Sequence, residues 1–273
     1  MSRMLILQLE RFGRLSSAEK LALAGTIGRP RGFPPRLDLP REEDRAGVMN
    51  VLLAGFACRY TVLPSGRRQI LAYLLPGEPC DQRAGQHEVS DHCLGTLTAV
   101  SIASFPREEL ACVAQRFPRI ARAFELMSAA EQATMRQWLL SLGHRSALER
   151  TAHLLCELFT RLRAIGLAGA ARCELPLRQV DLADALALSS VHMNRTLAQI
   201  RHRKLAIVVR RQLFIDDLQA LQSLCGFRPH YLFGGCWPAV DDRRGAVEAA
   251  DEEAVPAAVE IRSGTQLATP TRL

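Results

Sequence analysis

The chain has 273 residues, which is enough for two ordinary domains that each bury a hydrophobic core. Apolar residues make up 48% and charged residues 23% of it, and these globular proportions exclude a chain that is disordered throughout. The formal net charge of +7 favours a polyanionic partner, whereas no apolar run reaches the roughly 18 residues of a membrane span, so we expect no membrane contact.

The eight cysteines are scattered along the sequence and none forms a CxxC pair. No secretory signal pattern stands at the start, so we expect a cytoplasmic protein with reduced, mostly buried thiols. The cysteine spacing indicates neither zinc nor an iron–sulfur cluster, and we predict no metal site.

Residues 1–117 predict an amino-terminal β domain. It begins with a lead-in helix over 1–25, in which Ser16 and Glu19 fit a capping box. Three apolar or alternating segments follow that predict β-strands, at 48–53, 57–62 and 69–75. Because the strands are short and closely spaced, we expect a small antiparallel barrel or sandwich.

The last two of these strands are joined by a turn at Pro64-Ser65-Gly66, which predicts a hairpin. Tyr60, Arg67, Arg68 and Gln69 lie on this hairpin. We interpret them as a solvated hairpin face, with a contact to an effector or to another domain as the alternative.

Helical periodicity begins at residue 118. The residues that recur there at steps of three and four are apolar except for Glu131 and Thr134: Ile120, Phe124, Met127, Glu131, Thr134, Trp138 and Leu142. The pattern predicts a helix over 118–143 that has more apolar surface than one domain needs, and we expect this surface to join two copies of the chain. A core helix within one copy is the alternative. A second helix is expected over 146–165.

The most informative segment is 179–203, because two short helical patterns flank a turn at Ala187-Leu188-Ser189. Ser189 is suited to cap the second helix, and Asn194 and Arg195 are expected to face outward from it. A short polar helix supported by a compact apolar one fits the major groove of duplex DNA. Between Arg172 and Arg211 there are eight basic and three acidic residues, so the segment also carries the charge that phosphates attract.

Residues 205–209 and 212–215 predict a hairpin with Arg210 and Arg211 at its tip, where their side chains would reach backbone phosphate. A last short helix is expected over 217–225 with Asp216 as its cap. The tail over 228–273 turns acidic and is rich in alanine and proline, and we expect it to be disordered.

In this order of elements the chain resembles the Crp/Fnr family of bacterial transcription regulators over about residues 16–232. The motifs that carry the resemblance are Ala57-Cys58-Arg59-Tyr60, Leu75-Pro76-Gly77-Glu78, the segment 152–158 and Val191-His192-Met193-Asn194-Arg195. The resemblance implies an α+β fold: an amino-terminal β-roll (jelly-roll-like) sensor domain, a long dimerisation helix over 118–143, and a carboxy-terminal winged helix-turn-helix over 144–227.

Cyclic-nucleotide-binding members of this family hold the ribose with a Glu and the cyclic phosphate with an Arg followed by Ser or Thr. The matching cassette starts at Gly77 and Glu78, and these positions fall on Gln82, His92 and Cys93. Since a guanidinium that could pair with phosphate in bidentate fashion is lost, we expect no cyclic AMP binding and predict no cofactor.

The signal that the sensor domain detects is therefore unassigned. The family's oxygen-sensing branch carries a cysteine cluster near its amino terminus, whereas the first cysteine here is Cys58, within a predicted strand. Cys80, His87, His92 and Cys93 are close in sequence and could gather around a metal, haem or oxidant, but we favour small buried cysteines and a histidine on a loop.

The predicted DNA contacts are Ser189, Ser190, Val191, His192, Asn194, Arg195, Arg201, Arg210 and Arg211. Arg195 keeps the family's position, where bidentate pairing to guanine is expected. Val191 stands where relatives often have Glu, so we expect a different half-site. Ala187 and Lys204 stand where Gly is common, and either costs up to ~1 kcal/mol if its φ must be positive.

We therefore predict a homodimeric transcription factor that binds double-stranded DNA at half-sites about 34 Å apart, with RNA polymerase as a further partner. The alternative is a regulatory or scaffold partner that has lost DNA or effector binding. A third possibility is an enzyme with Cys80 or Cys93 as nucleophile beside His92. No orienting group accompanies these residues, so we predict no enzymatic activity.

Overall fold

The structure is a computed structural model that describes residues 3–39, 47–80 and 92–233. Two helices open it, α1 (Arg3–Glu10) and α2 (Ser17–Gly25), so the single lead-in helix that we predicted is wrong. The capping box is confirmed: the backbone N–H of Glu19 donates to Ser16 Oγ over 3.3 Å, and the N–H of Ser16 donates to the Glu19 carboxylate over 2.7 Å. This cap starts α2 afresh and thereby separates it from α1.

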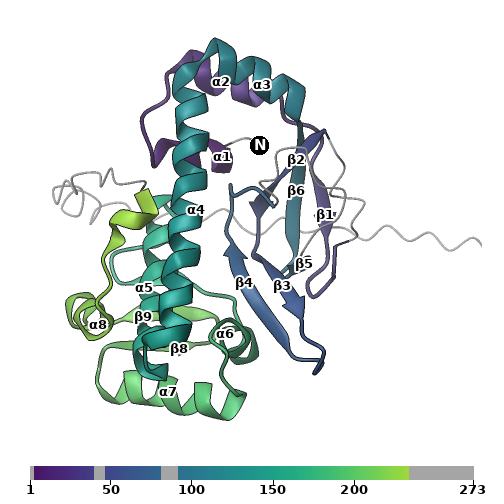
Figure 1. Ribbon diagram of the computed structural model, residues 1–273. Coiled ribbons are helices and arrows are strands. Elements are labelled where there is room, and N and C mark those ends of the chain that lie inside the picture. Colours follow the sequence, from purple (N-terminus) through teal and green to yellow (C-terminus); the bar gives the residue numbers. More distant parts are fainter. Residues whose placement is uncertain (1–2, 40–46, 81–91, 234–273) are drawn as a thin grey trace, which may run out of the picture. The chain divides into compact units, whose positions relative to one another are not determined.

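The amino-terminal domain contains two antiparallel three-stranded sheets, ordered β1-β6-β2 and β4-β3-β5 (Figure 1). Its strands are β1 (Arg31–Phe33), β2 (Val48–Ala54), β3 (Ala57–Val62), β4 (Arg68–Leu74), β5 (Cys93–Thr96) and β6 (Val100–Pro106). The three predicted strands correspond to β2, β3 and β4. Gly66, with a φ of 77°, lies in the predicted turn between β3 and β4.

Helices α3 (Arg107–Arg116) and α4 (Pro118–His144) follow the sheets. The predicted apolar pattern of α4 packs within this chain: Ile120 is fully buried, and Trp138 donates from its ring N–H to Glu157 over 3.0 Å. Of the predicted positions only Leu142 is exposed, and it forms an exposed apolar strip with Met135 and Leu139, which the pattern did not include. The face that we predicted for self-association is therefore wrong, because the sensor domain and α5 already cover much of it.

The carboxy-terminal part comprises α5 (Ala147–Ala164), β7 (Arg172–Glu174), α6 (Gln179–Ala185), α7 (Ser190–His202), β8 (Ala206–Val209), β9 (Gln212–Ile215) and α8 (Leu218–Cys225). The third sheet has the order β7-β9-β8, and its strand β7 was not predicted. The cap of α8 is Asp217, whose carboxylate accepts from the N–H of Ala220 over 2.9 Å, and not Asp216 as predicted.

The predicted tail begins with an ordered segment, the short 3-10 helix η2 (Pro229–Phe233). Leu232 and Phe233 are buried in the main core, so the expectation of disorder is wrong for residues 229–233. The remainder of the predicted tail, 234–273, lies outside the described residues.

Candidate nucleic-acid interface

Helix α7 is built so that one side is buried and the other is exposed. Ser189 begins it as predicted, with its hydroxyl accepting from the N–H of His192 over 3.2 Å. Met193, Thr196 and Ile200 are almost fully buried, and they recur at three- and four-residue steps. Val191, His192, Asn194, Arg195 and Gln199 on the other side are exposed, which is the arrangement that a DNA-recognition helix requires.

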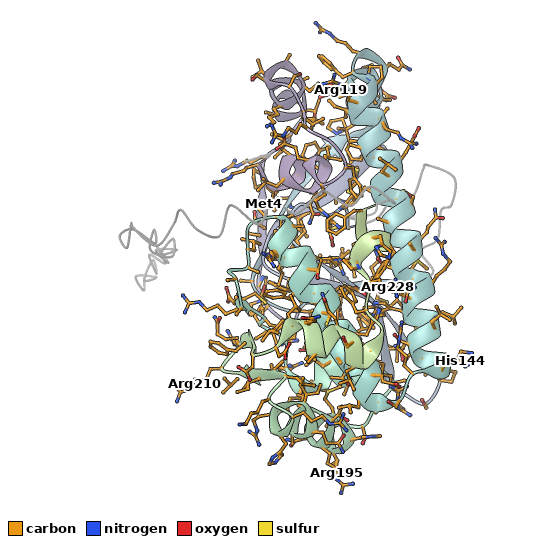
Figure 2. All side chains as sticks on the ribbon, turned by 90° about the vertical axis from the view of Figure 1, so that its left-hand side faces the viewer. Met4, Arg119, His144, Arg195, Arg210 and Arg228 are labelled. Carbon is orange, nitrogen blue, oxygen red and sulfur yellow. The ribbon has the colours of Figure 1, made fainter. Side chains whose placement is uncertain are left out.

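All nine predicted DNA-contact residues are exposed. Six of them lie in the turn before α7 or in its first two turns, Arg201 lies near its end, and Arg210 and Arg211 form the tip of the β8–β9 hairpin, which we call the wing. The side chains of Arg195 and Arg210 both extend away from the ribbon (Figure 2). We refer to these nine residues together as the α7–wing surface.

The turns before and after α7 have positive φ values at the two positions where glycine is common in the family. Ala187 has a φ of 51° and Lys204 a φ of 55°, both in the left-handed region. A residue with a Cβ is strained there by roughly 1 kcal/mol. The turns on both sides of α7 are therefore made at a cost in stability.

The wing has the same feature in a stronger form. Val209 pairs with Gln212, so Arg210 and Arg211 alone form the turn. Their φ values are 49° and 64°, which is the two-residue turn type that normally carries Asn-Gly. The backbone N–H of Leu175, just after β7, donates to the carbonyl of Arg211 over 2.8 Å and holds the turn in place.

Acidic side chains of the helix-turn-helix are turned away from this surface. Asp181 of α6 is fully buried and accepts two hydrogen bonds from Arg36, at 2.9 and 3.0 Å, and one from Arg68 at 2.8 Å. Arg68 also donates to Asp184 over 2.9 Å. Burial alone would raise the pKa of Asp181, but the hydrogen bonds from Arg178 and Arg68 and the charge of Arg36 leave it below its usual value.

These contacts correct our interpretation of the β3–β4 hairpin as a solvated face. Besides Arg68, Gln69 donates to the carbonyl of Ala185 over 3.2 Å, and the buried hydroxyl of Tyr73 donates to the carbonyl of Asp181 over 3.0 Å. The structure instead shows the alternative that we considered, a contact between this hairpin and another domain. It joins β4 to α6, and among the described residues the ion pairs of Asp181 and Asp184 involve no basic residue of α7 or the wing.

The structure also brings one unpredicted residue to the surface of α7. Gln179 is exposed at the first position of α6, and its side-chain oxygen accepts from the amide of Asn194 over 3.3 Å. The two residues are fifteen positions apart, and only the packing of α6 on α7 makes them neighbours. The sequence pattern carries no signal for this contact.

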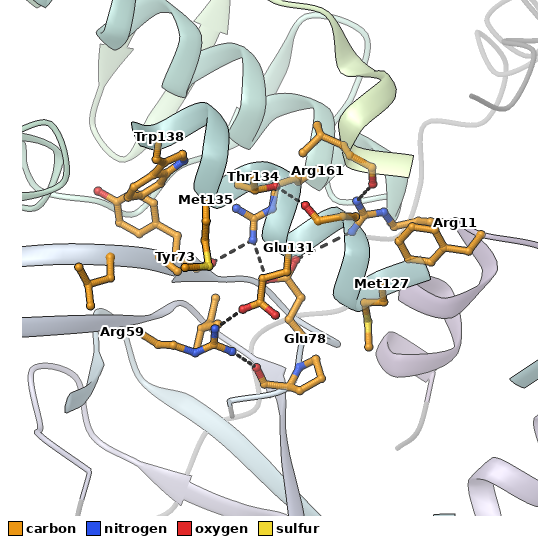
Figure 3. A pocket seen from close by; sticks show the side chains of 17 residues that line it. Arg11, Arg59, Tyr73, Glu78, Met127, Glu131, Thr134, Met135, Trp138 and Arg161 are labelled. Carbon is orange, nitrogen blue, oxygen red and sulfur yellow. Dashed lines mark hydrogen bonds and ion pairs between the residues drawn. The ribbon is translucent and has the colours of Figure 1, made fainter. Parts of the chain in front are cut away.

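A second feature lies between β4 and α4, where residues enclose a cavity of about 60 Å³ (Figure 3). Tyr73, Glu78 and Arg161 are among the residues that line it. Arg59 of β3 pairs with Glu131 of α4 at its edge. The ion pair thus links the sensor sheet to the long helix.

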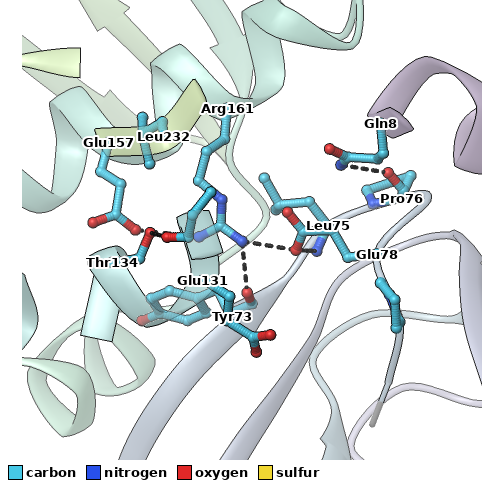
Figure 4. Close-up of polar contacts among 12 residues, drawn as sticks. Gln8, Tyr73, Leu75, Pro76, Glu78, Glu131, Thr134, Glu157, Arg161 and Leu232 are labelled. Carbon is cyan, nitrogen blue, oxygen red and sulfur yellow. Dashed lines mark hydrogen bonds and ion pairs between the residues drawn. The ribbon is translucent and has the colours of Figure 1, made fainter. Parts of the chain in front are cut away.

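The start of the predicted cassette is occupied by internal contacts. Glu78 accepts from Arg161 over 2.7 Å and from the backbone N–H of Leu75 over 2.9 Å (Figure 4). Arg161 also donates to Glu157 over 3.2 Å. A Cβ on Gly77 would lie 2.2 Å from the carbonyl oxygen of Met4, so only glycine fits there.

The other cassette positions are only partly described. His92 and Cys93 are half-buried, Cys80 is buried, and Gln82 and His87 lie outside the described residues. Within residues 3–39, 47–80 and 92–233, no group of three or more His, Cys, Asp or Glu is placed to hold a metal ion. No helix in that same part of the chain is long and apolar enough to cross a membrane.

Comparison with known proteins also indicates that α7 and the wing bind DNA. A family model described as the Crp-like helix-turn-helix domain matches residues 149–224. The nitrogen fixation regulation protein FixK of Bradyrhizobium diazoefficiens is 32% identical over 185 residues, which cover 67% of this chain and 76% of that protein. The transcriptional activatory protein AadR of Rhodopseudomonas palustris is 28% identical over 194 residues, covering 70% of this chain and 79% of that protein.

Among solved structures, FixK2 from Bradyrhizobium japonicum matches with a TM-score of 0.60 and 26% identity, over 72% of this chain and 96% of that one. The exposed face of α7, the wing beside it and these relatives define a DNA-binding transcription regulator. The chain belongs to the Crp/Fnr family, and the predicted α+β fold of β-roll, long helix and winged helix-turn-helix is confirmed.

Proposed function

We propose that the chain acts as a homodimer that binds a two-fold-related DNA site through the α7–wing surface. The observation that carries this proposal is the division of charge: Asp181 and Asp184 pair with Arg36 and Arg68, whereas Arg195 and the wing arginines are exposed. Arg195 is then free to pair with a guanine, and the wing with the DNA beside it.

The second copy is expected on the exposed strip of α4. Met135, Leu139 and Leu142 are 58%, 72% and 37% exposed, and apolar side chains at this spacing are buried when two helices pair. Two such chains would place their α7 helices one turn of duplex apart, about 34 Å. The domain limits of 1–117, 118–143 and 144–227 are the divisions that we propose for this arrangement.

The sensor domain would bias the orientation of the two winged domains through its contacts with α4 and α6. Two links support this route, Arg59 with Glu131 and Arg68 with Asp181. We propose no cyclic nucleotide as the signal, because Glu78 is already paired with Arg161 and His92 stands where a phosphate-binding arginine is expected. We also propose that the chain contacts RNA polymerase and that it has no enzymatic activity.

The proposal is tested by selection from random duplex DNA with the purified full chain. We expect the wild-type chain to select a two-fold-related motif and Arg195→Ala to lose that selection. Arg122→Ala is the matched control, because Arg122 is an exposed arginine of α4, outside α7 and the wing, and it should keep the motif. If the Arg195→Ala chain recovers the same motif, the assignment of α7 is wrong. If the wild-type chain shows only salt-sensitive, sequence-independent binding, the alternative of a regulator that no longer recognises DNA replaces it.

A further inference from the structure

The wing is the one place in the described residues where two consecutive residues with side chains take positive φ values, since Arg36, Ala187 and Lys204 do so singly. Seven glycines take positive φ values in the described residues, among them Gly66 in the β3–β4 hairpin. The wing turn has the same need, yet both of its positions carry arginine. Because strained backbone persists where the strained residue has a task, the side chains of Arg210 and Arg211 are the reason to look for one.

Backbone hydrogen bonds and burial fix the strands on which the turn is built. β9 is paired on both sides, with β7 and β8, and Leu213 at its centre is fully buried. The hydrogen bond from Leu175 reaches the turn itself, at the carbonyl of Arg211. The backbone that carries the two arginines is therefore already in place before the wing binds.

The base of the wing is attached to the carboxyl end of α7. The backbone N–H of Leu205 donates to the carbonyl of Ile200 over 3.2 Å, and that of Asp216 donates to the carbonyl of Leu205 over 2.9 Å. Strand β8 has four residues, so the tip lies about 13 Å from this base. With α7 in the major groove, that reach carries the tip across one phosphate backbone to the adjacent minor groove.

The chemistry at the tip suits that groove. Neither guanidinium has a hydrogen bond or ion pair within the described part of the chain, and the nearest acidic position on the sheet, Glu174, pairs with Gln212 and not with the turn. If the wing only needed a positive charge to contact phosphate, an arginine at an unstrained strand position such as Val209 would be sufficient. Two arginines at the tip project furthest, as entry into a groove requires.

We propose that Arg210 and Arg211 enter the minor groove beside each half-site and favour A·T-rich sequence there. This inference rests on the proposed function, since α7 must first set the register. Narrow A·T minor grooves have an enhanced negative potential that attracts arginine, and they lack the guanine amino group that obstructs the floor. The wing thereby adds specificity at positions that α7 does not touch.

The test uses the full chain and duplexes that share one selected core but differ in their flanks: A·T, G·C, or inosine·C. Inosine·C presents the G·C pattern in the major groove and lacks the amino group in the minor groove. We expect A·T and inosine·C flanks to be bound about tenfold more tightly than G·C flanks. Equal affinity for all three overturns the inference, and so does inosine·C behaving as G·C.

Two variants separate groove entry from phosphate contact. The double change Arg210→Lys with Arg211→Lys keeps both charges, and we expect the core to be retained while the flank preference falls below about twofold. The double change Arg210→Asn with Arg211→Gly suits the turn, and we expect the flank preference to be lost and Tm to rise by about 2–4 °C.

Flank preference that survives in either variant contradicts the inference, as does a uniform loss of affinity with a smaller salt dependence, which indicates phosphate contact only. A wild-type chain that selects no core at all contradicts the proposed function itself. If a core is selected but the affinity does not depend on the flanking sequence, only the role of the wing is contradicted.

Discussion

Ala187 is the residue at which strain should be simplest to measure. Its φ of 51° lies in the left-handed region, and it is exposed in the turn between α6 and α7. Ala187→Gly should therefore raise the free energy of unfolding by up to about 1 kcal/mol, because the Cβ is the source of the strain. Urea unfolding of the two proteins checks this.

The matched control is Ala198→Gly in the interior of α7, where the backbone is helical. It should lower the free energy of unfolding by about 1 kcal/mol. Equal destabilisation by the two substitutions would show that the turn at residue 187 is not strained.

His153 makes stability depend on pH. Burial, helped by the charge of Arg145, lowers its pKa to about 3, and its ring lies edge-on to Phe227 with centroids 5.1 Å apart. In the unfolded chain the pKa is about 6.5, so the unfolded state takes up the proton first as pH falls. The stability contributed by the neutral ring is complete above about pH 6.5 and is lost below it, by about 2 kcal/mol at pH 5.

His153→Phe keeps an aromatic ring at this position and removes the titratable group. Between pH 7.5 and 5 the variant should lose about 2 kcal/mol less free energy of unfolding than the wild type. His202→Gln, at an exposed position of α7, should leave the pH dependence as it is. Identical pH profiles for wild type and His153→Phe would contradict this account.

At the scale of elements, the exposed strip of α4 predicts how the chain associates. Leu139 is 72% exposed, the most of the strip, and a dimer buries it twice. Leu139→Glu should raise the dissociation constant of the dimer by at least about a hundredfold, because apolar burial is lost and a charge would be buried on each side. Analytical ultracentrifugation measures it.

Leu21→Glu is the control for this experiment, since Leu21 is 75% exposed on α2, outside the strip. It should leave the dissociation constant unchanged. A Leu139→Glu chain that remains as dimeric as the control would place the second copy on another surface.

The contact of β4 with α6 can be tested through Arg68, whose side chain pairs with both Asp181 and Asp184. Arg68→Ala removes two charged hydrogen bonds and should speed amide exchange in α6 by about tenfold or more. Arg67→Ala, an exposed neighbour, should not. Equal exchange in the two variants would mean that the hairpin does not hold α6.

At the scale of the molecule, local patterns predicted the elements well. The capping box at Ser16, the cap at Ser189 and the turn at Gly66 each depend on residues within a few positions of one another. The same holds for the positive φ at Ala187 and Lys204, which followed from the residue type expected in such turns. Strands β1, β5, β6 and β7 and helix α3 were not predicted, and each of these strands forms only through partners elsewhere in the chain.

The face of α4 shows where local pattern stops being informative. The sequence contains two apolar strips on this helix, and periodicity cannot tell which one the chain itself covers. Trp138 is buried because Tyr73 and Glu157 come from elsewhere to pack on it. Arg68 was placed in solvent for the same reason, since its partners lie more than a hundred residues further along.

In the function that we propose, Arg195 recognises a base pair from the exposed side of α7. The most direct measurement is the affinity of wild type and Arg195→Ala for the selected duplex and for duplexes with one G·C pair of each half-site replaced in turn. At the pair that Arg195 contacts, we expect replacement in each half-site to lower the affinity of wild type about tenfold and to leave that of Arg195→Ala unchanged. If Arg195→Ala discriminates at every pair as well as wild type does, α7 does not recognise DNA through this residue.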